Sequence, residues 1–99
     1  MSITDPEAEV ALQADLAWAQ TAVNQLVRVP LKQSMYDALV SFVYNVGMNA
    51  FSKSTMLRKL NLKDYAGASK EFSRWVYDNG KEIKGIVARR RIEQSMFDN

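Results

Sequence analysis

The chain has 99 residues, a formal net charge of +2 and a hydrophobic content of 47%, which is enough for one folded domain with one core. It contains no cysteine and no histidine. This excludes disulfides, a thiolate nucleophile, a histidine general base and the commonest zinc ligands. We therefore expect no metal site and no cofactor, and the apolar content argues against intrinsic disorder.

Charge is distributed unevenly along the chain. Residues 1–50 carry two basic and five acidic side chains, whereas residues 51–99 carry eleven basic and six acidic ones. The basic half suits a polyanion such as nucleic acid, anionic lipid or cell wall, and a solvated helical surface explains it equally well. Of these partners we expect nucleic acid least. The sequence opens with no basic and apolar segment typical of a secretory signal, and no apolar run is long enough to span a membrane.

The first predicted element is an amphipathic helix of about twenty residues, because apolar residues recur at intervals of three and four from Ala8 to Leu26. Thr4 and Glu7 form a capping-box pattern at its start. The helix should end before Pro30, since a proline pushes the preceding residue into an extended conformation.

The segment Met35–Gly47 is apolar on nearly every side of a helix, with only Asp37, Ser41 and Asn45 interrupting it. A helix of this kind must be covered on most sides, so we expect it to be the central, buried helix. Gly47 supplies the left-handed residue that commonly ends a helix.

Three more helices are predicted: a short one over 55–60, one over 65–75 and a last one over 86–96, whereas 48–51 should form a short turn. The apolar stripe of the last helix consists of Ala88, Ile92 and Met96. We thus expect an all-α fold, a small orthogonal bundle of about five helices around the central one, as a single domain over residues 1–99.

Catalysis without histidine or cysteine would have to rest on carboxylates, amides, hydroxyls and arginines. Glycoside hydrolysis is the reaction class that uses a carboxylic acid with a second carboxylate or an activated water. Asp37 is the only acid embedded in an apolar helix, and a structural role explains it better than a catalytic one. No pair of acids stands out as a catalytic acid and base, so we expect no catalytic residue in this chain.

Four side chains are candidates for ligand binding. Asn45 could hydrogen-bond a sugar or peptide, or cap the end of the central helix. Trp75 could stack on a sugar ring, or simply belong to the core. Arg89 and Arg90 could hold a carboxylate or phosphate in bidentate fashion, or pair with Glu93 on the same helix.

Taken together, the motifs resemble the phage-type lysozymes, the muramidase endolysins that cut peptidoglycan. The matching segments follow the family order and cover nearly the whole chain. They are Ile3-Thr4-x-x-Glu7-Ala8, Ala22-Val23-Asn24, Val29-Pro30-Leu31-x-Gln33, Asp37-Ala38-Leu39-Val40-Ser41-Phe42-x-Tyr44-Asn45-Val46-Gly47, Phe51-Ser52-x-Ser54-Thr55-x-Leu57, Asp64-Tyr65-x-Gly67-Ala68, Phe72-x-Arg74-Trp75 and Gly85-Ile86-Val87-x-Arg89-Arg90-Arg91-x-Glu93. Lys84 departs from the family, which usually places a proline before the glycine.

The resemblance also implies what this chain lacks. In that family a catalytic glutamate ends an N-terminal helix, and a small β-lobe then carries an acidic residue and a threonine that position the attacking water. These features precede the part that matches, so we expect this chain to be the C-terminal helical lobe and inactive alone. By resemblance, Asn45 and Trp75 face or support the cleft, and Arg89 or Arg90 approaches the glutamate.

The resulting expectation is a lysozyme-like domain, related to bacteriolytic muramidases, whose partner is peptidoglycan. The alternative is a repurposed phage-derived binding or inhibitor module. Such a module would bind a protein partner, or a second copy of itself, through the bundle surface that the N-terminal helix covers in the family. The site of action would be the cell wall or periplasm for an endolysin, or the host cytoplasm during phage production.

Overall fold

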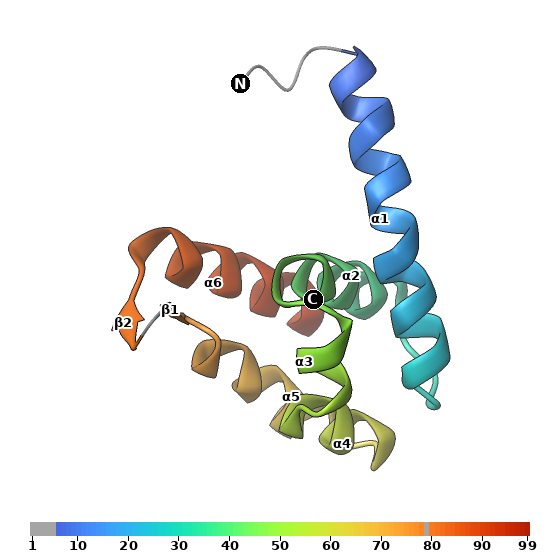
Figure 1. Cartoon of the computed structure of the whole chain (residues 1–99). Helices are drawn as coiled ribbons and strands as arrows, with labels where there is room; N and C mark the ends of the chain where they lie inside the picture. The colour runs from blue at the N-terminus through green and yellow to red at the C-terminus, as the bar shows by residue number, and fades with distance from the viewer. Residues whose placement is uncertain (1–5, 79) are drawn as a thin grey trace.

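The computed structural model describes the backbone of residues 6–78 and 80–99 and the side chains of residues 16–77 and 80–99, so the predicted capping box at Thr4 lies outside it. This part of the chain holds six α-helices, a single 3-10 turn and a two-stranded hairpin (Figure 1). The helices are α1 (Pro6–Leu26), α2 (Gln33–Val46), α3 (Met48–Ser52), α4 (Thr55–Asn61), α5 (Tyr65–Glu71) and α6 (Lys84–Asp98). The turn η1 is Phe72–Arg74, and the antiparallel strands are β1 (Tyr77–Asp78) and β2 (Lys81–Glu82).

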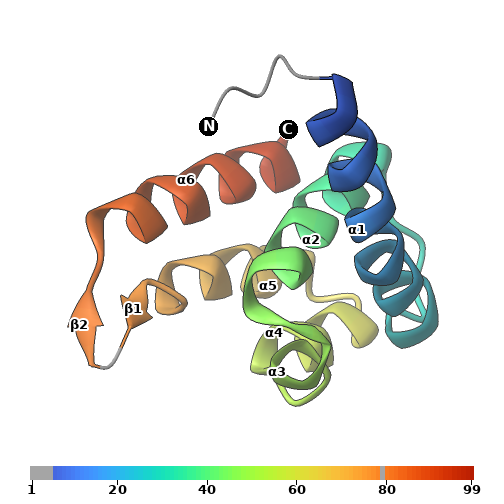
Figure 2. The same ribbon diagram turned by 45° about the horizontal axis from the view of Figure 1, so that its top comes forward.

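Helix α2 is the centre of the fold, as its apolar sequence predicts. Leu39, Phe42 and Val43 are completely buried. Helix α1 packs against α2 on one side and α6 lies along it on another, while the hairpin sits at the start of α6, far from α1 (Figure 2). The all-α fold and the central position of this helix are therefore confirmed.

Local capping residues fix where the helices begin and end. Gly47 ends α2 at φ +94°, a backbone conformation that residues other than glycine rarely adopt. The Ser54 hydroxyl accepts the Leu57 N–H at 3.0 Å and so caps α4. Asp64 caps α5 by accepting the Gly67 N–H at 2.9 Å, and this approach is so close that a side chain at Gly67 would collide with the carboxylate.

The loop after α1 is fastened to the turn between α4 and α5. The Asn61 side chain donates to the Leu26 carbonyl at 3.1 Å and accepts the Arg28 N–H at 2.8 Å. The Tyr65 hydroxyl donates to the Pro30 carbonyl at 2.7 Å. Segments more than thirty residues apart in the sequence are thereby held side by side.

The structure differs from the sequence-based expectation in four places. The helix expected over 65–75 ends as α5 at Glu71 and is followed by the 3-10 turn η1. The segment expected to be a turn is the short helix α3, so the described part has six helices rather than five. A hairpin of two-residue strands precedes α6. The stripe predicted for α6 is wrong at Ala88 and Ile92, which are exposed, whereas Met96 packs partly buried against the core. The buried residues of this helix are Arg90, Glu93 and Phe97. Two charged residues occupy inward positions, which an apolar pattern cannot reveal.

No helix in the described part of the chain combines the length and hydropathy needed to cross a bilayer.

The core is organised around aromatic rings. Phe42 meets Phe51, Phe72 and Trp75 edge to face, with ring centroids 6.2, 5.4 and 5.4 Å apart. Such pairs add to the stabilisation that burial alone provides.

Phe42→Ala should lower the free energy of unfolding by about 3–5 kcal/mol, because it removes a fully buried ring and leaves a cavity among its neighbours. Ile92→Ala, at a side chain that is 63% exposed on α6, should change it by less than about 0.5 kcal/mol. Urea unfolding followed by circular dichroism compares the two. Equal midpoints for the two variants would show that the core is not centred on this ring.

Candidate functional site

Arg90 of α6 is a buried arginine that joins three segments of the fold. Its side chain is 2% exposed. The guanidinium donates from Nε to the Trp75 carbonyl at 3.0 Å, from Nη1 to the Glu93 carboxylate and from Nη2 to the Asn45 side-chain oxygen. It also lies over the Phe42 ring, with Cζ 5.0 Å from the ring centroid, in a cation–π contact.

Glu93 provides the negative charge that balances Arg90. It is 1% exposed, and its second carboxylate oxygen accepts the Ser41 hydroxyl at 2.5 Å. The Arg89 Nε lies 3.5 Å from the same oxygen. One buried carboxylate therefore pairs with two arginines of α6 and accepts a hydrogen bond from a hydroxyl of α2.

We call Ser41, Asn45, Arg90 and Glu93 the Arg90 network. Arg90 and Glu93 are buried, Ser41 is half-buried and Asn45 is exposed. Within the described residues, no buried side-chain nitrogen or oxygen lacks a hydrogen-bond partner. Complete pairing matters because breaking a buried ion pair leaves a charge without solvent or counterion. The network therefore fixes where α2, α6 and the segment after η1 stand relative to one another.

A pocket of about 370 Å³ opens on one side of the Arg90 network. Its lining consists of Asn45, Val46, Arg74, Trp75, Tyr77, Ile86 and Arg90. Trp75 is half-buried because its ring packs edge-on against Phe42, whereas Tyr77 is 60% exposed. None of the described carboxylates lines this pocket. We call it the Asn45–Trp75 pocket.

A second hollow, of about 350 Å³, lies between α1, α2 and α6. It is lined by Leu16, Gln20, Tyr36, Asp37, Val40, Ser41, Tyr44 and Arg89. At its edge Trp18, 43% exposed, stacks on Tyr44 with ring centroids 6.0 Å apart. We call this hollow, together with Trp18, the α1–α2 groove.

The four side chains singled out in the sequence divide between these two hollows. Asn45, Trp75 and Arg90 meet at the first, where Arg90 lies in the floor. Arg89 is 46% exposed and lies at the second, and its predicted pairing with Glu93 is present. The structure therefore separates two neighbouring arginines that the sequence left as alternatives.

Other partners were not found from the sequence. From α2, the Ser41 hydroxyl donates to Glu93 and the Phe42 ring lies against Arg90. Only the spacing of Glu93 from the arginines of α6 gave a signal for the network in the sequence. Asp37 is exposed, and its carboxylate accepts the Gln33 side-chain amide at 2.8 Å in a surface contact within α2. Among the described side chains, no three acidic groups lie close enough to hold a metal ion.

Glu93→Gln should destabilise the fold by about 3–5 kcal/mol, since it leaves the Arg90 guanidinium buried without its counterion. Glu82→Gln, at an exposed position of β2, is the matched control and should have little effect. Urea unfolding of Glu93→Gln, Arg90→Met and the double variant gives the coupling energy. If the two single costs simply add, the pair is not coupled as the geometry requires.

Comparison with known proteins places this arrangement in a family. The sequence profile of the phage lysozyme family matches residues 1–93. The chain is 44% identical to an endolysin of Acyrthosiphon pisum secondary endosymbiont phage 1 and 44% identical to the endolysin of Salmonella phage P22. Each match covers 98% of this chain, and the chain spans 69% and 66% of the length of those two relatives. For the SAR-endolysin of Escherichia phage Mu, 44% identical, the span is 54%.

Solved structures agree with the sequence relatives. The muramidase domain of SpmX from Asticaccaulis excentricus is 36% identical, with a TM-score of 0.91 over 98% of this chain and 69% of that domain. A point mutant of P22 lysozyme is 41% identical, with a TM-score of 0.88 over 100% of this chain and 67% of that protein. The profile match and these relatives together show that the chain belongs to the phage lysozyme family.

Proposed function

We propose that this chain is the helical lobe of a peptidoglycan-degrading lysozyme and forms one wall of its glycan-binding cleft. The observation that carries the proposal is the Asn45–Trp75 pocket, which the buried Arg90–Glu93 pair underlies, in a member of this family. Its relatives are described as endolysins and as a muramidase domain. The site of action would be the bacterial cell wall or periplasm, after production in the host cytoplasm.

The pocket has the chemistry that an amino sugar with acidic substituents requires. The half-exposed ring of Trp75 and the exposed ring of Tyr77 offer flat apolar surfaces on which a sugar can stack. The side chains of Asn45 and Arg74 line the same hollow, and the Arg74 side chain is 75% exposed. An exposed guanidinium can pair with a carboxylate of the peptidoglycan.

Hydrolysis needs a group that this pocket lacks. Glycosidases of the usual kind protonate the leaving oxygen with a carboxylic acid. Two carboxylates are buried among the described residues, and both are already paired. Glu93 is held by Arg90, Arg89 and Ser41, and Glu71 by Lys59 and Arg74. We infer that the acid is supplied from outside these 99 residues. Without it, the loss of general acid catalysis alone should lower the rate by about 10²–10⁴.

Purified 99-residue chain should not clear a suspension of bacterial cell walls above the buffer blank. An endolysin of the same family, measured in parallel, shows that the walls are susceptible. Turnover by the isolated chain would contradict the proposal that the acid lies outside it.

Binding to insoluble peptidoglycan should survive without catalysis and should depend on Trp75. Trp75→Ala should reduce the sedimented fraction several-fold, because one stacking aromatic contributes about 1 kcal/mol or more. Trp18→Ala, at the α1–α2 groove, is the matched control and should bind normally. Equal loss in both variants would indicate that the pocket does not hold the glycan.

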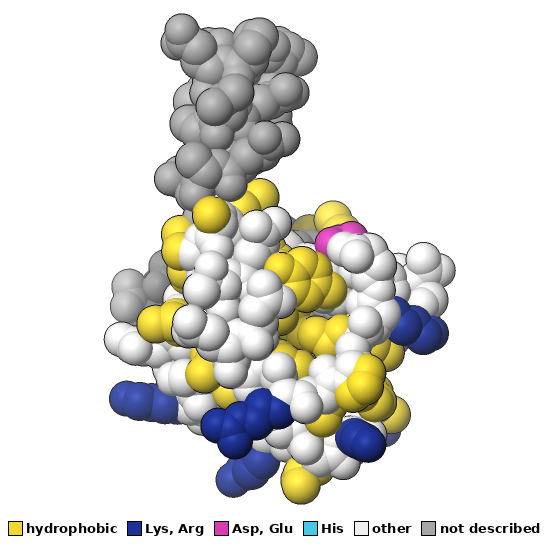
Figure 3. Space-filling view, turned by 90° about the vertical axis from the view of Figure 1, so that its right-hand side faces the viewer, with side chains coloured by type: hydrophobic (Ala, Val, Ile, Leu, Met, Phe, Trp, Pro, Cys, Tyr) yellow, Lys and Arg dark blue, Asp and Glu magenta, His cyan; other side chains and the backbone are white. Residues whose placement is uncertain are grey.

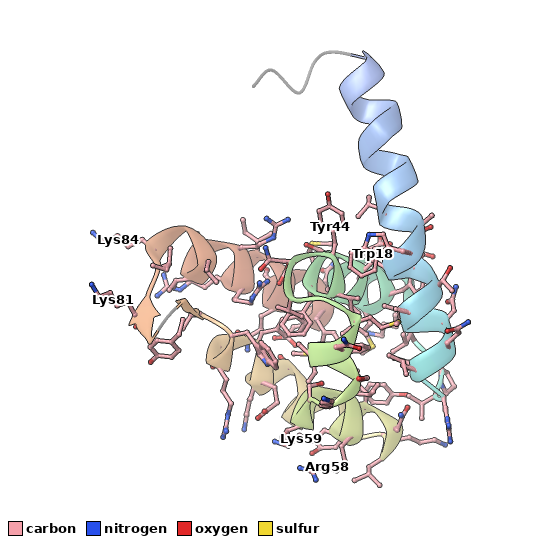
Figure 4. The ribbon with its side chains drawn as sticks, viewed as in Figure 1. Trp18, Tyr44, Arg58, Lys59, Lys81 and Lys84 are labelled. Carbon is pink, nitrogen blue, oxygen red and sulfur yellow. The ribbon has the colours of Figure 1, made fainter. Side chains whose placement is uncertain are left out.

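The α1–α2 groove favours a second candidate function, a module that binds protein. Figure 3 shows hydrophobic side chains exposed in the middle of the face that carries α1. Trp18 and Tyr44 lie close together at its edge, one from α1 and one from α2 (Figure 4). Exposed apolar patches of this kind often serve as interaction surfaces. The occupant would be a helix of a partner, or a second copy of this chain.

Sedimentation analysis over a range of concentrations tests this second candidate. If the groove binds another copy, the average mass should rise with concentration, and Trp18→Glu should suppress the rise. Ile92→Glu, at an exposed apolar side chain of α6, should leave it unchanged. A monomer at every concentration would exclude self-association through the groove.

A further inference from the structure

A basic surface lies where the loop after α1 meets α4 and α5. Four exposed cations contribute to it, Arg28, Arg58, Lys63 and Lys70, and we call them with Leu62 the basic face. Figure 3 shows dark-blue Lys and Arg side chains gathered along this lower part of the molecule. Arg58 projects from α4 at the lower edge in Figure 4.

Backbone contacts bring Arg28, Arg58 and Lys63 together around Leu62, and Lys70 lies further along, in the last turn of α5. The Arg28 N–H donates to Asn61, the residue directly before Leu62, at 2.8 Å. The Leu62 N–H donates to the Arg58 carbonyl at 3.2 Å, so Leu62 lies one turn beyond Arg58 on the same side of α4. Lys63 follows with φ +63°, which turns the chain sharply into α5. Leu62 therefore stands at a corner with Arg58, Lys63 and Arg28 beside it.

The acidic side chains nearby offset only part of this charge. Asp64 caps α5 through the Gly67 N–H and is exposed, so it keeps its negative charge beside Lys63. Glu71 is 4% exposed and is paired with Lys59 at 3.2 Å and Arg74 at 3.3 Å. Among the described residues, none of the four cations of the basic face makes an ion pair with an acid. The face is therefore a net positive surface rather than a network of salt bridges.

Leu62 distinguishes one kind of anionic partner from another. Its side chain is 73% exposed, the most exposed of the large apolar side chains in the described part. An aliphatic tip between cations gains free energy when it enters the headgroup region of a bilayer, while the cations stay at the phosphates. A nucleic-acid backbone offers the same phosphates but no apolar layer for this side chain.

We propose that the basic face docks the protein onto the surface of a bilayer that contains anionic phospholipids. Each basic side chain close to such a surface strengthens binding by about fivefold at 25 °C. None of the basic-face residues lines the Asn45–Trp75 pocket. The proposal does not depend on the glycan-binding function.

The test is co-sedimentation of the 99-residue chain with vesicles of phosphatidylglycerol and phosphatidylcholine. Binding is expected at low salt, is expected to weaken as salt rises, and is expected to be absent with pure phosphatidylcholine. Neutralising Arg58 and Lys63 together, as Arg58→Gln with Lys63→Gln, should weaken binding by about 25-fold. The control neutralises Lys81 and Lys84, which lie at a different edge of the molecule (Figure 4), and should weaken it far less.

Leu62→Ser tests the apolar part of the proposal, with Ile92→Ser as the control because Ile92 is 63% exposed on α6. Only the first should lower the binding that remains at high salt. Circular dichroism confirms that each variant is folded. Equal losses for the two charge pairs, no effect of Leu62→Ser, or binding to duplex DNA as strong as to the vesicles would overturn the proposal.

Discussion

The rest of this structure depends on the hydrogen bonds and the ion pair of the buried Arg90 guanidinium. It binds a carboxylate from its own helix, an amide oxygen from α2 and a backbone carbonyl after η1, and it lies over the central ring of the core. An arginine can do this because its planar group has five donors in a fixed arrangement. A charge so deeply buried is tolerated only with complete pairing, so the network constrains all three segments at once.

The same network separates two surfaces of different character. On one side it forms the floor of the Asn45–Trp75 pocket, where aromatic rings and polar groups meet. On the other, Ser41 and Arg89 reach the α1–α2 groove, whose remaining lining is largely apolar. A substitution at Glu93 should therefore shift side chains that line both hollows. The pocket suits a glycan and the groove suits a segment of protein, so the two proposed functions need not exclude each other.

Much of this fold could be predicted from the sequence because its helices obey simple rules. The apolar circumference of α2 predicts its burial, and Gly47 ends it as expected. The prediction failed at α6, where a buried ion pair replaces the apolar stripe and exposes Ile92. It also failed to separate Arg89 from Arg90, since one residue along a helix turns a side chain by about 100° and the neighbours decide which one is buried. Pairings such as Ser41 with Glu93 join positions 52 residues apart, and no local pattern indicates them.

The two tryptophans allow a direct test of the central claim that the Asn45–Trp75 pocket is the glycan-binding surface. Each contributes one indole N–H signal to a proton–nitrogen correlation spectrum, with Trp75 in the pocket and Trp18 at the α1–α2 groove. Titration with a soluble peptidoglycan fragment should shift the Trp75 signal and leave the Trp18 signal in place. A shift of Trp18 alone, or no shift of either signal at saturating ligand, would contradict the claim.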